Sequence, residues 1–489
     1  MKLHQVLIFI LSVFALLFVA WFFIPAGGIK AGRVSLRFPS YEARLDDLRN
    51  GTSGVDVDSV LQAARRSYEM LKESEDSLGF FHEYLASDSA RIHLPGDDWS
   101  FFDSLFIAMD GADTAGRIVR IMHYGDSQLE MDRISSVLRQ ELQERFGGSG
   151  PGMVPMIQRI PSVSVRQSAS GALTRFARVA DSLSHWTSTH RYGPMTQSVA
   201  VYGNGTFNFR SSDSRYAKER VRTISKVAVL LGHNSKDLRL TLRCDTLKPM
   251  TAVLDSAREE VSLVKWDLPV AVAKGSVTIS GNAEVYGVLL DGDPGVTVDN
   301  VAMRGCSGTV FTDIDPGIMR ESFDLLDTRL VILQFGGNAM PGIGSRKAIS
   351  SYVRHIEDQF GYFREVAPKA KLLFVGPADM CKSAEGYFGT WPLLEDLNDS
   401  LRVHCLEAGV AYWDTFSVMG GAGSMRKWVS HNPPLAGPDY IHFTTRGADE
   451  IGGALAKSLL LYDDFHRLRM KLSEAVVKEY MDSLSAAAK

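Results

Sequence analysis

From Arg117 onward, short apolar segments that fit β-strands alternate with longer segments that fit helices. Strands that alternate with helices predict βαβ units around a buried parallel sheet, because parallel strands need a crossover connection. The predicted strands are 118–122, 296–303, 330–335, 371–375 and 409–413, and the predicted helices are 129–145, 346–366, 392–408 and 446–461. The sequence therefore predicts a three-layer α/β/α domain with a five-stranded parallel sheet.

One crossover in this pattern is far longer than a single helix requires. About 150 residues separate the first predicted helix from the second predicted strand, whereas a crossover needs about a dozen. Within 160–295 apolar and polar residues alternate, as in 226–231 and 276–280, and glycines separate the segments as turns. Short, closely spaced strands of this kind predict a β-sandwich inserted into the α/β domain.

An uncharged apolar stretch precedes all of these elements. Residues 6–24 could span a hydrocarbon core of about 30 Å as a helix that rises about 1.5 Å per residue. A cleaved signal peptide is the alternative, because Lys2 supplies a basic start. The stretch exceeds a usual signal core, however, and no typical cleavage site follows it. We therefore expect a single-pass transmembrane signal anchor, with the rest of the chain outside the cytoplasm.

These patterns divide the chain into six parts. They are the transmembrane anchor (1–30), a mainly helical spacer (31–110), a first α/β segment (111–159), the inserted β-sandwich (160–295), a second α/β segment (296–465) and a C-terminal helix (466–489). The spacer and the C-terminal helix are predicted from apolar residues at steps of three or four.

Composition narrows the classes of function. A net charge of −4 and a pI near 6.3 do not favour nucleic-acid binding, which usually needs a basic excess. Four dispersed cysteines fit neither a disulfide scaffold nor a zinc site. His, Asp and Glu residues show no spacing typical of metal ligands, so we expect no metal and no other cofactor.

A serine follows the first predicted strand at the point where a helix begins. This position places Ser127 of Gly125-Asp126-Ser127 at the carboxyl end of the sheet, the edge at which open α/β sheets bind ligands. The alternative is that Asp126 or Ser127 only caps the helix. We interpret the nearby His123 as a core histidine without a catalytic role.

Three further segments fall at the same edge of the predicted sheet. The turn at 305–308 lets a backbone N–H approach a bound oxygen, and the amide of Asn338 can donate to that oxygen. Asp439 and His442 follow the fifth strand, and a nucleophilic serine needs a base and a carboxylate that orients the imidazole. Each segment alone fits a plain turn, a loop Asn or a surface His. Together they predict a site for acyl transfer through a serine.

These motifs resemble the SGNH (GDSL-like) hydrolase superfamily, whose four blocks supply a Ser, a Gly, an Asn and an Asp-x-x-His. The resemblance implies the SGNH-hydrolase fold, the catalytic residues Ser127, Asp439 and His442, and the oxyanion-hole donors Gly308 and Asn338. Gly305 is the alternative to Gly308, which is preferred because it ends the Ser-Gly pair typical of the second block.

Residues 123–128 and the glycine-rich 146–152 resemble a narrower branch, the periplasmic peptidoglycan O-acetyl esterases of Gram-negative bacteria. That branch carries a carbohydrate-binding-module-like β insertion at the place of 160–295. Gln128 departs from the branch, which commonly has His at this position. Because the position is outside the triad, the departure should affect contacts with the substrate more than the chemistry. The resemblance implies a serine esterase that removes O-acetyl groups from peptidoglycan or a similar envelope polysaccharide, anchored in the bacterial inner membrane with its catalytic domain in the periplasm.

Two alternative functions use the same residues differently. A polysaccharide O-acetyltransferase would replace water with a sugar hydroxyl, and a membrane acetyl-transfer protein would then be a partner. An inactive carbohydrate-binding protein would use only the sandwich. Esterase and transferase differ in water access and acceptor binding, which the motifs do not encode. The expected partners are therefore an O-acetylated glycan and the inner membrane, and no nucleic acid.

Overall fold

The computed structural model describes residues 91–179, 181–245, 247–384 and 387–472, together with 29–31, 34–36, 58, 61–62 and 81. The predicted anchor at 6–24 and most of the predicted spacer lie outside the described residues. Among the helices that are described, none combines the length and the apolar character needed to cross a membrane.

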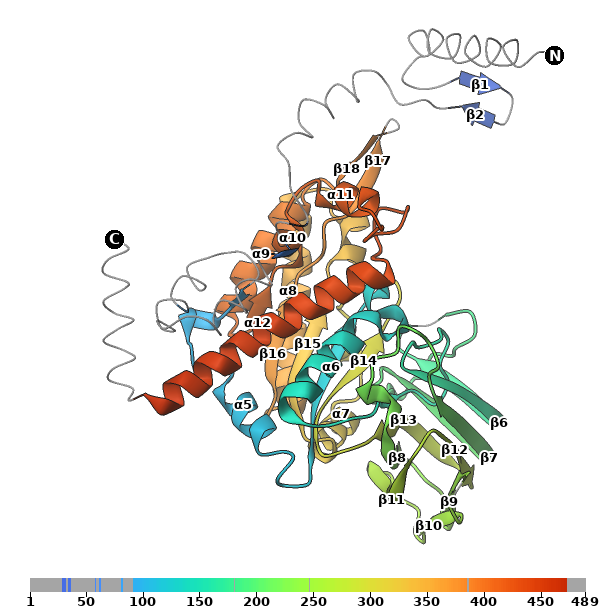
Figure 1. Cartoon of the computed structure of the whole chain (residues 1–489). Coiled ribbons are helices and arrows are strands. Elements are labelled where there is room, and N and C mark those ends of the chain that lie inside the picture. The colour runs from blue at the N-terminus through green and yellow to red at the C-terminus, as the bar shows by residue number, and fades with distance from the viewer. Residues whose placement is uncertain are drawn as a thin grey trace, which may run out of the picture.

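A six-stranded sheet forms the centre of the α/β body (Figure 1), with the strand order β14-β4-β15-β16-β19-β3. Its strands are β3 (Ile92–His93), β4 (Ile118–Gly125), β14 (Gly295–Ala302), β15 (Thr328–Gln334), β16 (Lys371–Val375) and β19 (Ala411–Trp413). All neighbours except β3 pair in parallel. These parallel strands are buried almost throughout, as expected for a sheet that helices cover on both faces.

Strand β3 corrects the predicted sheet and the predicted spacer. It pairs antiparallel with β19 through His93 and Ile92, so the sheet has six strands instead of five. A strand of two residues is too short to show an alternating pattern. Ile92, Phe102 and Phe106 also lie in the core cluster of the α/β body, so the part of the predicted spacer that follows residue 90 belongs to this body.

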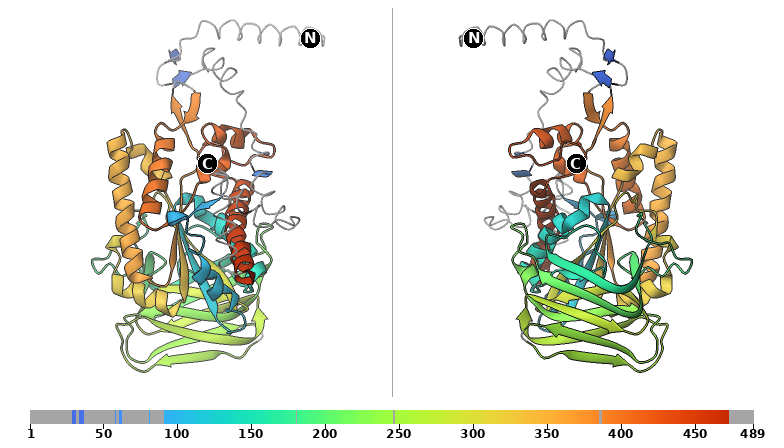
Figure 2. Two further views of the ribbon diagram at one scale, coloured as in Figure 1. Left: turned by 90° about the vertical axis from the view of Figure 1, so that its left-hand side faces the viewer. Right: turned by 90° about the vertical axis from the view of Figure 1, so that its right-hand side faces the viewer.

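Helices cover the two faces of this sheet. They are α5 (Asp103–Asp110), α6 (Arg133–Phe146), α7 (Pro316–Leu325), α8 (Arg346–Val366), α9 (Leu394–Glu407), α10 (Thr415–Met419), α11 (Ser424–Ser430) and α12 (Thr445–Lys471). Buried residues of α5, α6 and α12 share one apolar cluster, and those of α7, α8 and α9 share another on the opposite face (Figure 2). Helix α12 runs through the predicted boundary at 466, because its apolar spacing continues without a break.

The strands between α6 and β14 form a second sheet of nine strands, in the order β10-β9-β12-β7-β13-β8-β11 with β5 on β13 and β6 on β7. They are β5 (Gly152–Val154), β6 (Val165–Ala177), β7 (Gln197–Ser211), β8 (Ile224–Gly232), β9 (Leu238–Cys244), β10 (Met250–Leu254), β11 (Ser262–Val272), β12 (Lys274–Ser280) and β13 (Ala283–Asp291). One half of β7 pairs with β12 and the other with β13, so the sheet divides into two parts. Side chains from both parts form one apolar cluster.

A buried ion cluster joins the two sheets. Arg120 on β4 donates Nη1 to both carboxylate oxygens of Asp299 on β14, each at 2.9 Å, and pairs with Asp291 at the end of β13. Asp299 also accepts a hydrogen bond of 2.7 Å from the backbone N–H of Met153 on β5. The second sheet therefore begins before residue 160, the predicted boundary. Because unpaired buried charges are strongly destabilising, this cluster depends on both sheets being in place.

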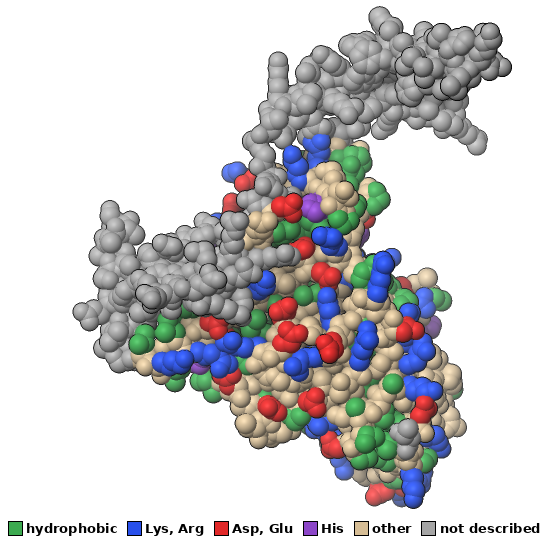
Figure 3. Space-filling model, in the orientation of Figure 1, with side chains coloured by type: hydrophobic (Ala, Val, Ile, Leu, Met, Phe, Trp, Pro, Cys, Tyr) green, Lys and Arg blue, Asp and Glu red, His purple; other side chains and the backbone are tan. Residues whose placement is uncertain are grey.

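Two hairpins lie outside the two large sheets. Strands β17 (Cys381–Ala384) and β18 (Tyr387–Thr390) form one beside the α/β body, and β1 (Ile29–Ala31) and β2 (Val34–Leu36) form the other. Figure 3 shows acidic and basic side chains interspersed on the face that it draws, in line with the net charge of −4.

Candidate active site

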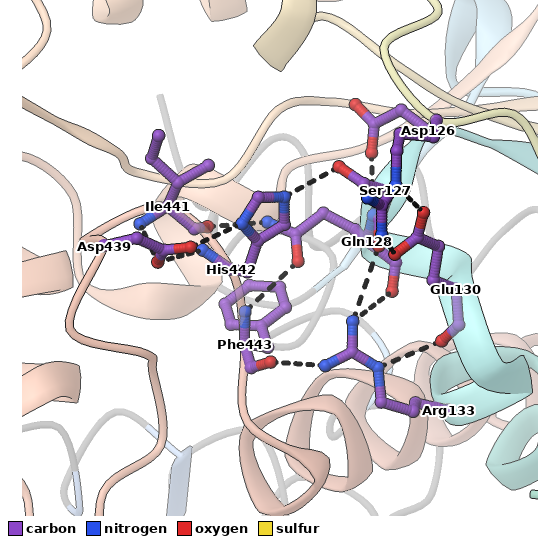
Figure 4. A network of polar contacts seen from close by, with 10 residues as sticks. Asp126, Ser127, Gln128, Glu130, Arg133, Asp439, Ile441, His442 and Phe443 are labelled. Carbon is purple, nitrogen blue, oxygen red and sulfur yellow. Dashed lines mark hydrogen bonds and ion pairs between the residues drawn. The ribbon is translucent and has the colours of Figure 1, made fainter. Parts of the chain in front are cut away.

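Four segments from distant parts of the chain meet at the carboxyl ends of the parallel strands. Ser127 opens the short 3-10 helix η2 (Ser127–Asp132), directly after β4. Asn338 lies in the 3-10 helix η5 (Gly337–Gly342), which follows β15. Asp439 and His442 lie in the loop before α12, and Figure 4 shows His442 between Asp439 and Ser127. The structure thus brings together the Ser, Asn, Asp and His expected from the sequence.

Hydrogen bonds link three of these side chains in series. Ser127 Oγ lies 2.7 Å from His442 Nε2, and His442 Nδ1 lies 2.7 Å from Asp439 Oδ2 (Figure 4). Asp439 Oδ1 accepts from the backbone N–H groups of Ile441 at 3.0 Å and His442 at 3.1 Å. Burial raises the pKa of Asp439, but the hydrogen bonds from His442 and Ile441 outweigh it and hold the pKa below its usual range. This is the geometry of a nucleophile, a base and a carboxylate that orients the base.

A pocket of about 600 Å³ opens over this series of hydrogen bonds. Ser127 and His442 line it, as do Asn338 and Gly305. A reacting carbonyl that enters the pocket can therefore contact the hydroxyl and the polar groups opposite it. Apolar side chains contribute another part of the wall, namely those of Trp391, Met380 and Pro377.

The structure favours Gly305 over Gly308 as the backbone donor to an oxyanion. Gly308 is absent from the residues that line the pocket, and its N–H lies 3.3 Å from Cys306 Sγ. A Cβ at Gly308 would lie 2.6 Å from the ring of Phe335, so close packing explains this glycine. Gly305 lines the pocket, and among the described residues no atom lies within 4 Å of a Cβ built there. Gly305 is therefore the better placed of the two glycines, and the oxyanion role of Gly308 stays a prediction.

Asp126 links the nucleophile segment to Asn338. Its Oδ1 accepts from the backbone N–H of Gln128 and its Oδ2 accepts from Asn338 Nδ2, both at 2.9 Å. The first contact is the helix cap considered as an alternative for this segment, and it coexists with the triad geometry. The second contact fixes the amide of Asn338 with one N–H toward Asp126, which leaves its other N–H to donate elsewhere.

Burial raises the pKa of Asp126 to about 6, although hydrogen bonds from Gln128 and Asn338 oppose this rise. A carboxyl group with a raised pKa in the folded state supports folding fully below its unfolded pKa of about 4, and this support disappears as the pH rises through about 6. We therefore expect the free energy of unfolding of wild type to fall by about 2 kcal/mol relative to that of Asp126→Asn between pH 4 and pH 7.5, because the unfolded carboxyl is already partly ionised at pH 4. Urea unfolding of both proteins at the two pH values measures this difference, and an equal difference at both would contradict it.

Two residues that sequence reasoning did not assign to the site hold the histidine segment. Gln128 donates Nε2 to the carbonyl of Ile441 at 2.7 Å and accepts from the N–H of Phe443 at 3.2 Å, so it brackets His442 (Figure 4). Arg133 donates Nη1 to the carbonyl of Phe443 at 2.5 Å and Nε to the carbonyl of Glu130 at 3.0 Å. These contacts tie the backbone around the base to the segment that carries the nucleophile.

His123 and the cysteines lie apart from this chemistry. His123 is fully buried on β4, between Gln334 Oε1 at 3.0 Å and Ser135 Oγ at 2.9 Å, and burial lowers its pKa to about 3. It is therefore a satisfied core histidine, as expected. All four cysteines are buried free thiols. Within the described part of the chain, no group of three His, Cys, Asp or Glu side chains could hold a metal ion.

A comparison with protein-family models finds one match, in the second part of the chain. Residues 276–449 match the GDSL-like Lipase/Acylhydrolase family. The matched range contains Asn338, Asp439 and His442 but not Ser127, which the fold brings to the site through β4. No curated protein matches the chain in a sequence comparison.

Among solved structures, a peptidoglycan O-acetylesterase aligns with 19% sequence identity and a TM-score of 0.59, over 76% of this chain and 97% of that chain. A family two carbohydrate esterase from Cellvibrio japonicus aligns with 11% identity and a TM-score of 0.25, over 61% of this chain and 98% of that chain. A salicylyl-acyltransferase from a tetracycline biosynthetic pathway aligns with 13% identity and a TM-score of 0.27, over 60% and 97%. TM-scores as low as the last two do not indicate a shared fold.

The first of these likenesses shows that the chain shares the overall fold of that esterase. The family match covers the part of the fold that carries the Asn and the Asp-x-x-His segments. Residues 276–449 therefore match a GDSL-like lipase/acylhydrolase model, and they lie within a fold similar to that of a peptidoglycan O-acetylesterase.

Proposed function

We propose that this protein is a serine esterase that removes O-acetyl groups from an envelope polysaccharide, namely peptidoglycan or a similar glycan. The observation that carries the proposal is the series of hydrogen bonds from Ser127 through His442 to Asp439 at the wall of an open pocket. The likeness in fold to a peptidoglycan O-acetylesterase supports the choice of substrate. The apolar wall around Trp391 gives a sugar ring a surface on which to pack.

In the proposed reaction His442 Nε2 takes the proton of Ser127 Oγ, which attacks the acetyl carbonyl carbon. The oxyanion that forms accepts hydrogen bonds from Asn338 Nδ2 and the Gly305 N–H. Collapse of this intermediate breaks the ester bond, and His442 returns the proton to the sugar oxygen that leaves. Water then attacks the acetyl-enzyme with His442 as base, and acetate and the free serine result.

Asn338→Ala tests the oxyanion donor. We expect kcat to fall by a factor of about 10²–10³, which corresponds to about 2.7–4 kcal/mol, with little change in KM, because the lost hydrogen bond forms mainly in the transition state. Steady-state kinetics with 4-nitrophenyl acetate measures both constants. Asn398→Ala on α9 removes another buried amide, whose Oδ1 accepts from the Tyr412 hydroxyl at 2.9 Å, and serves as a control for packing away from the pocket. A similar fall in kcat for both variants would point to a packing effect instead.

Gln128→Ala tests the contact that brackets His442. Loss of both hydrogen bonds frees the backbone on each side of the base, so we expect kcat to fall by about 10–100-fold, the scale for a displacement of about 1 Å. Gln128 is a positioning residue, so KM for a small ester should change less than kcat. An unchanged kcat in the folded variant would show that the remaining contacts suffice to place the ring.

The decisive experiment separates hydrolysis from transfer. The detergent-solubilised full chain is incubated with an O-acetylated glycan, with and without an unacetylated glycan acceptor, and free acetate and acetylated acceptor are both quantified. An esterase releases one acetate per ester consumed in either mixture. Acetylated acceptor that forms at the expense of acetate would favour the transferase, and no turnover of any ester would favour the carbohydrate-binding alternative.

We also propose that residues 6–24 anchor the protein in the inner membrane, with the hydrolase domain in the periplasm. The uncharged apolar stretch supports this placement. A cysteine introduced near the C-terminus should react with a membrane-impermeant thiol reagent in cells whose outer membrane alone is permeabilised. Protection from the reagent would contradict the proposed orientation.

A further inference from the structure

A second cavity of about 390 Å³ adjoins the catalytic pocket. It lies where the η2 segment meets β6 and β7 of the second sheet, and we call it the β6 groove. Its lining residues are Glu130, Met131, Gln158, Arg159, Ile160, Arg175, Ala177, Val179, Asp181, Thr196, Gln197, Ala302, Met303 and Arg304. Three of them, Glu130, Met131 and Arg304, also line the catalytic pocket, so the two cavities share a wall.

The shared wall consists of one ion pair and one side chain that reaches solvent. Arg304 pairs with both carboxylate oxygens of Glu130, with Nη2 2.6 Å from Oε2, and its side chain is 70% exposed. The second part of the wall is Met131, which has a φ of 64°. Its backbone carbonyl accepts a hydrogen bond of 2.9 Å from the N–H of Val163, and this contact fixes its position. A chain molecule that occupies the catalytic pocket can therefore continue over this wall into the β6 groove.

The two cavities differ in charge. In the β6 groove two guanidinium groups share one carboxylate: Arg175 Nη1 lies 3.1 Å from Asp181 Oδ2, and Arg159 Nε lies 3.4 Å from the same oxygen. The Arg304–Glu130 pair is neutral, so the groove has an excess of positive charge. The catalytic pocket has the opposite balance, because the buried carboxyl groups of Asp126 and Asp379 line it in addition to Glu130, against Arg133 and Arg304.

The remaining lining of the β6 groove suits a sugar. Amide and hydroxyl groups that can bond to sugar hydroxyls come from Gln158, Thr196 and Gln197. Apolar surface that can meet a pyranose face comes from Ile160 and Val179. Arg175 is only 10% exposed and its Nε donates to Gln197 Oε1 at 2.7 Å, so the cationic centre of the groove is held in place before any ligand arrives.

We propose that the β6 groove is a second glycan subsite, which binds a carboxylate-bearing part of the polysaccharide next to the sugar that loses its acetyl group. This inference rests on the proposed function and narrows its substrate to O-acetylated glycans that carry carboxylates. The carboxylate pairs with Arg159 and Arg175, while the uncharged acetylated sugar lies in the catalytic pocket. The charge difference between the cavities sets the direction in which the chain lies.

The affinity of the protein for the deacetylated product tests this subsite without turnover. Calorimetry with the full-length Ser127→Ala protein uses a de-O-acetylated peptidoglycan tetrasaccharide with free carboxylates, and the same oligosaccharide with its carboxylates capped as methylamides. Arg159→Gln should weaken binding of the free form by about two- to fivefold, the range for one partly exposed ion pair, and leave the capped form unchanged. Asp181→Asn removes the competing carboxylate and should strengthen binding of the free form only.

Arg166→Gln is the matched control. Arg166 lies at the start of β6, seven residues after Arg159, its side chain is 50% exposed against 41% for Arg159, and it pairs with Asp213 away from the groove. This variant should bind both oligosaccharides as the parent does. Equal effects of Arg159→Gln on both oligosaccharides, or no effect on either, would overturn the inference. Acetate release by wild type tests the proposed function separately. If the protein releases acetate but binds both oligosaccharides alike, only the proposed subsite is contradicted. If it distinguishes the two oligosaccharides but releases no acetate, only the proposed function is contradicted.

Discussion

Ser127→Ala is expected to lower kcat for acetyl-ester hydrolysis by on the order of 10⁶-fold, the effect of removing a nucleophile from a serine triad. The hydroxyl oxygen lies 2.7 Å from His442 Nε2, and without it no acetyl-enzyme can form. Steady-state rates with 4-nitrophenyl acetate and mass spectrometry of the protein during turnover measure the two consequences. The acetyl adduct of 42 Da per chain, about the mass of an acetyl group less a proton, should be absent from the variant.

Ser307→Ala controls for this change, because Ser307 lies in the turn after β14 and its hydroxyl contacts Thr309 instead of a base. The control should keep activity and the circular dichroism spectrum of wild type. A folded Ser127→Ala protein with wild-type turnover would remove the nucleophile assignment. Asp126 and Ser127 would then be no more than a cap on the segment that follows β4.

Asp439→Asn is expected to lower kcat by about 10⁴-fold while the loop keeps its shape. The amide oxygen can still accept from the N–H groups of Ile441 and His442, as Oδ1 does now. The amide nitrogen would then face His442 Nδ1 and favour the ring tautomer with its proton on Nε2. His442 Nε2 would then donate its proton to Ser127 Oγ and could not take the proton of the serine hydroxyl.

The pH dependence of rate and the stability of the variant distinguish this effect from unfolding. Asp414→Asn is a suitable control, because Asp414 follows β19 and caps α10 by accepting from the N–H of Ser417 at 3.0 Å. Asparagine also caps helices well, so this replacement should change stability by less than about 1 kcal/mol and leave kcat close to wild type. A fall of less than tenfold in Asp439→Asn would show that the imidazole keeps its orientation without the carboxylate.

The sequence predicted those parts of the fold that have long, buried apolar strands. Strands such as β15 and β16 read as continuous apolar segments because helices cover both of their faces. Strand β3 has two residues and pairs with a strand about 320 positions later, so no local pattern can indicate it. The second sheet was visible as alternation, whereas the pairing of β7 with β6, β12 and β13 depends on contacts across the whole insertion.

The same distinction applies to the site. Ser127, Asn338 and His442 could be placed at one edge because each follows a predicted strand or precedes a predicted helix. The choice between Gly305 and Gly308 depends instead on which of the two glycines lines the pocket, and this is visible only in three dimensions. The contact of Gln128 with Ile441 spans 313 positions, so only the folded chain reveals it.

The buried contact between Arg120 and Asp299 closes a segment of 179 residues, and this has a consequence for the order of folding. If the second sheet folds first, the pairing of β5 with β13 brings its two ends together, and the chain between β4 and β14 then behaves as a short loop. The entropic cost of closing a loop rises with the logarithm of its length, so shortening the loop from 179 residues to roughly 40 lowers the entropic barrier to β4–β14 pairing by about 1.3 kcal/mol. The insertion would then act as an internal template that assembles the nucleophile strand with the rest of the hydrolase sheet.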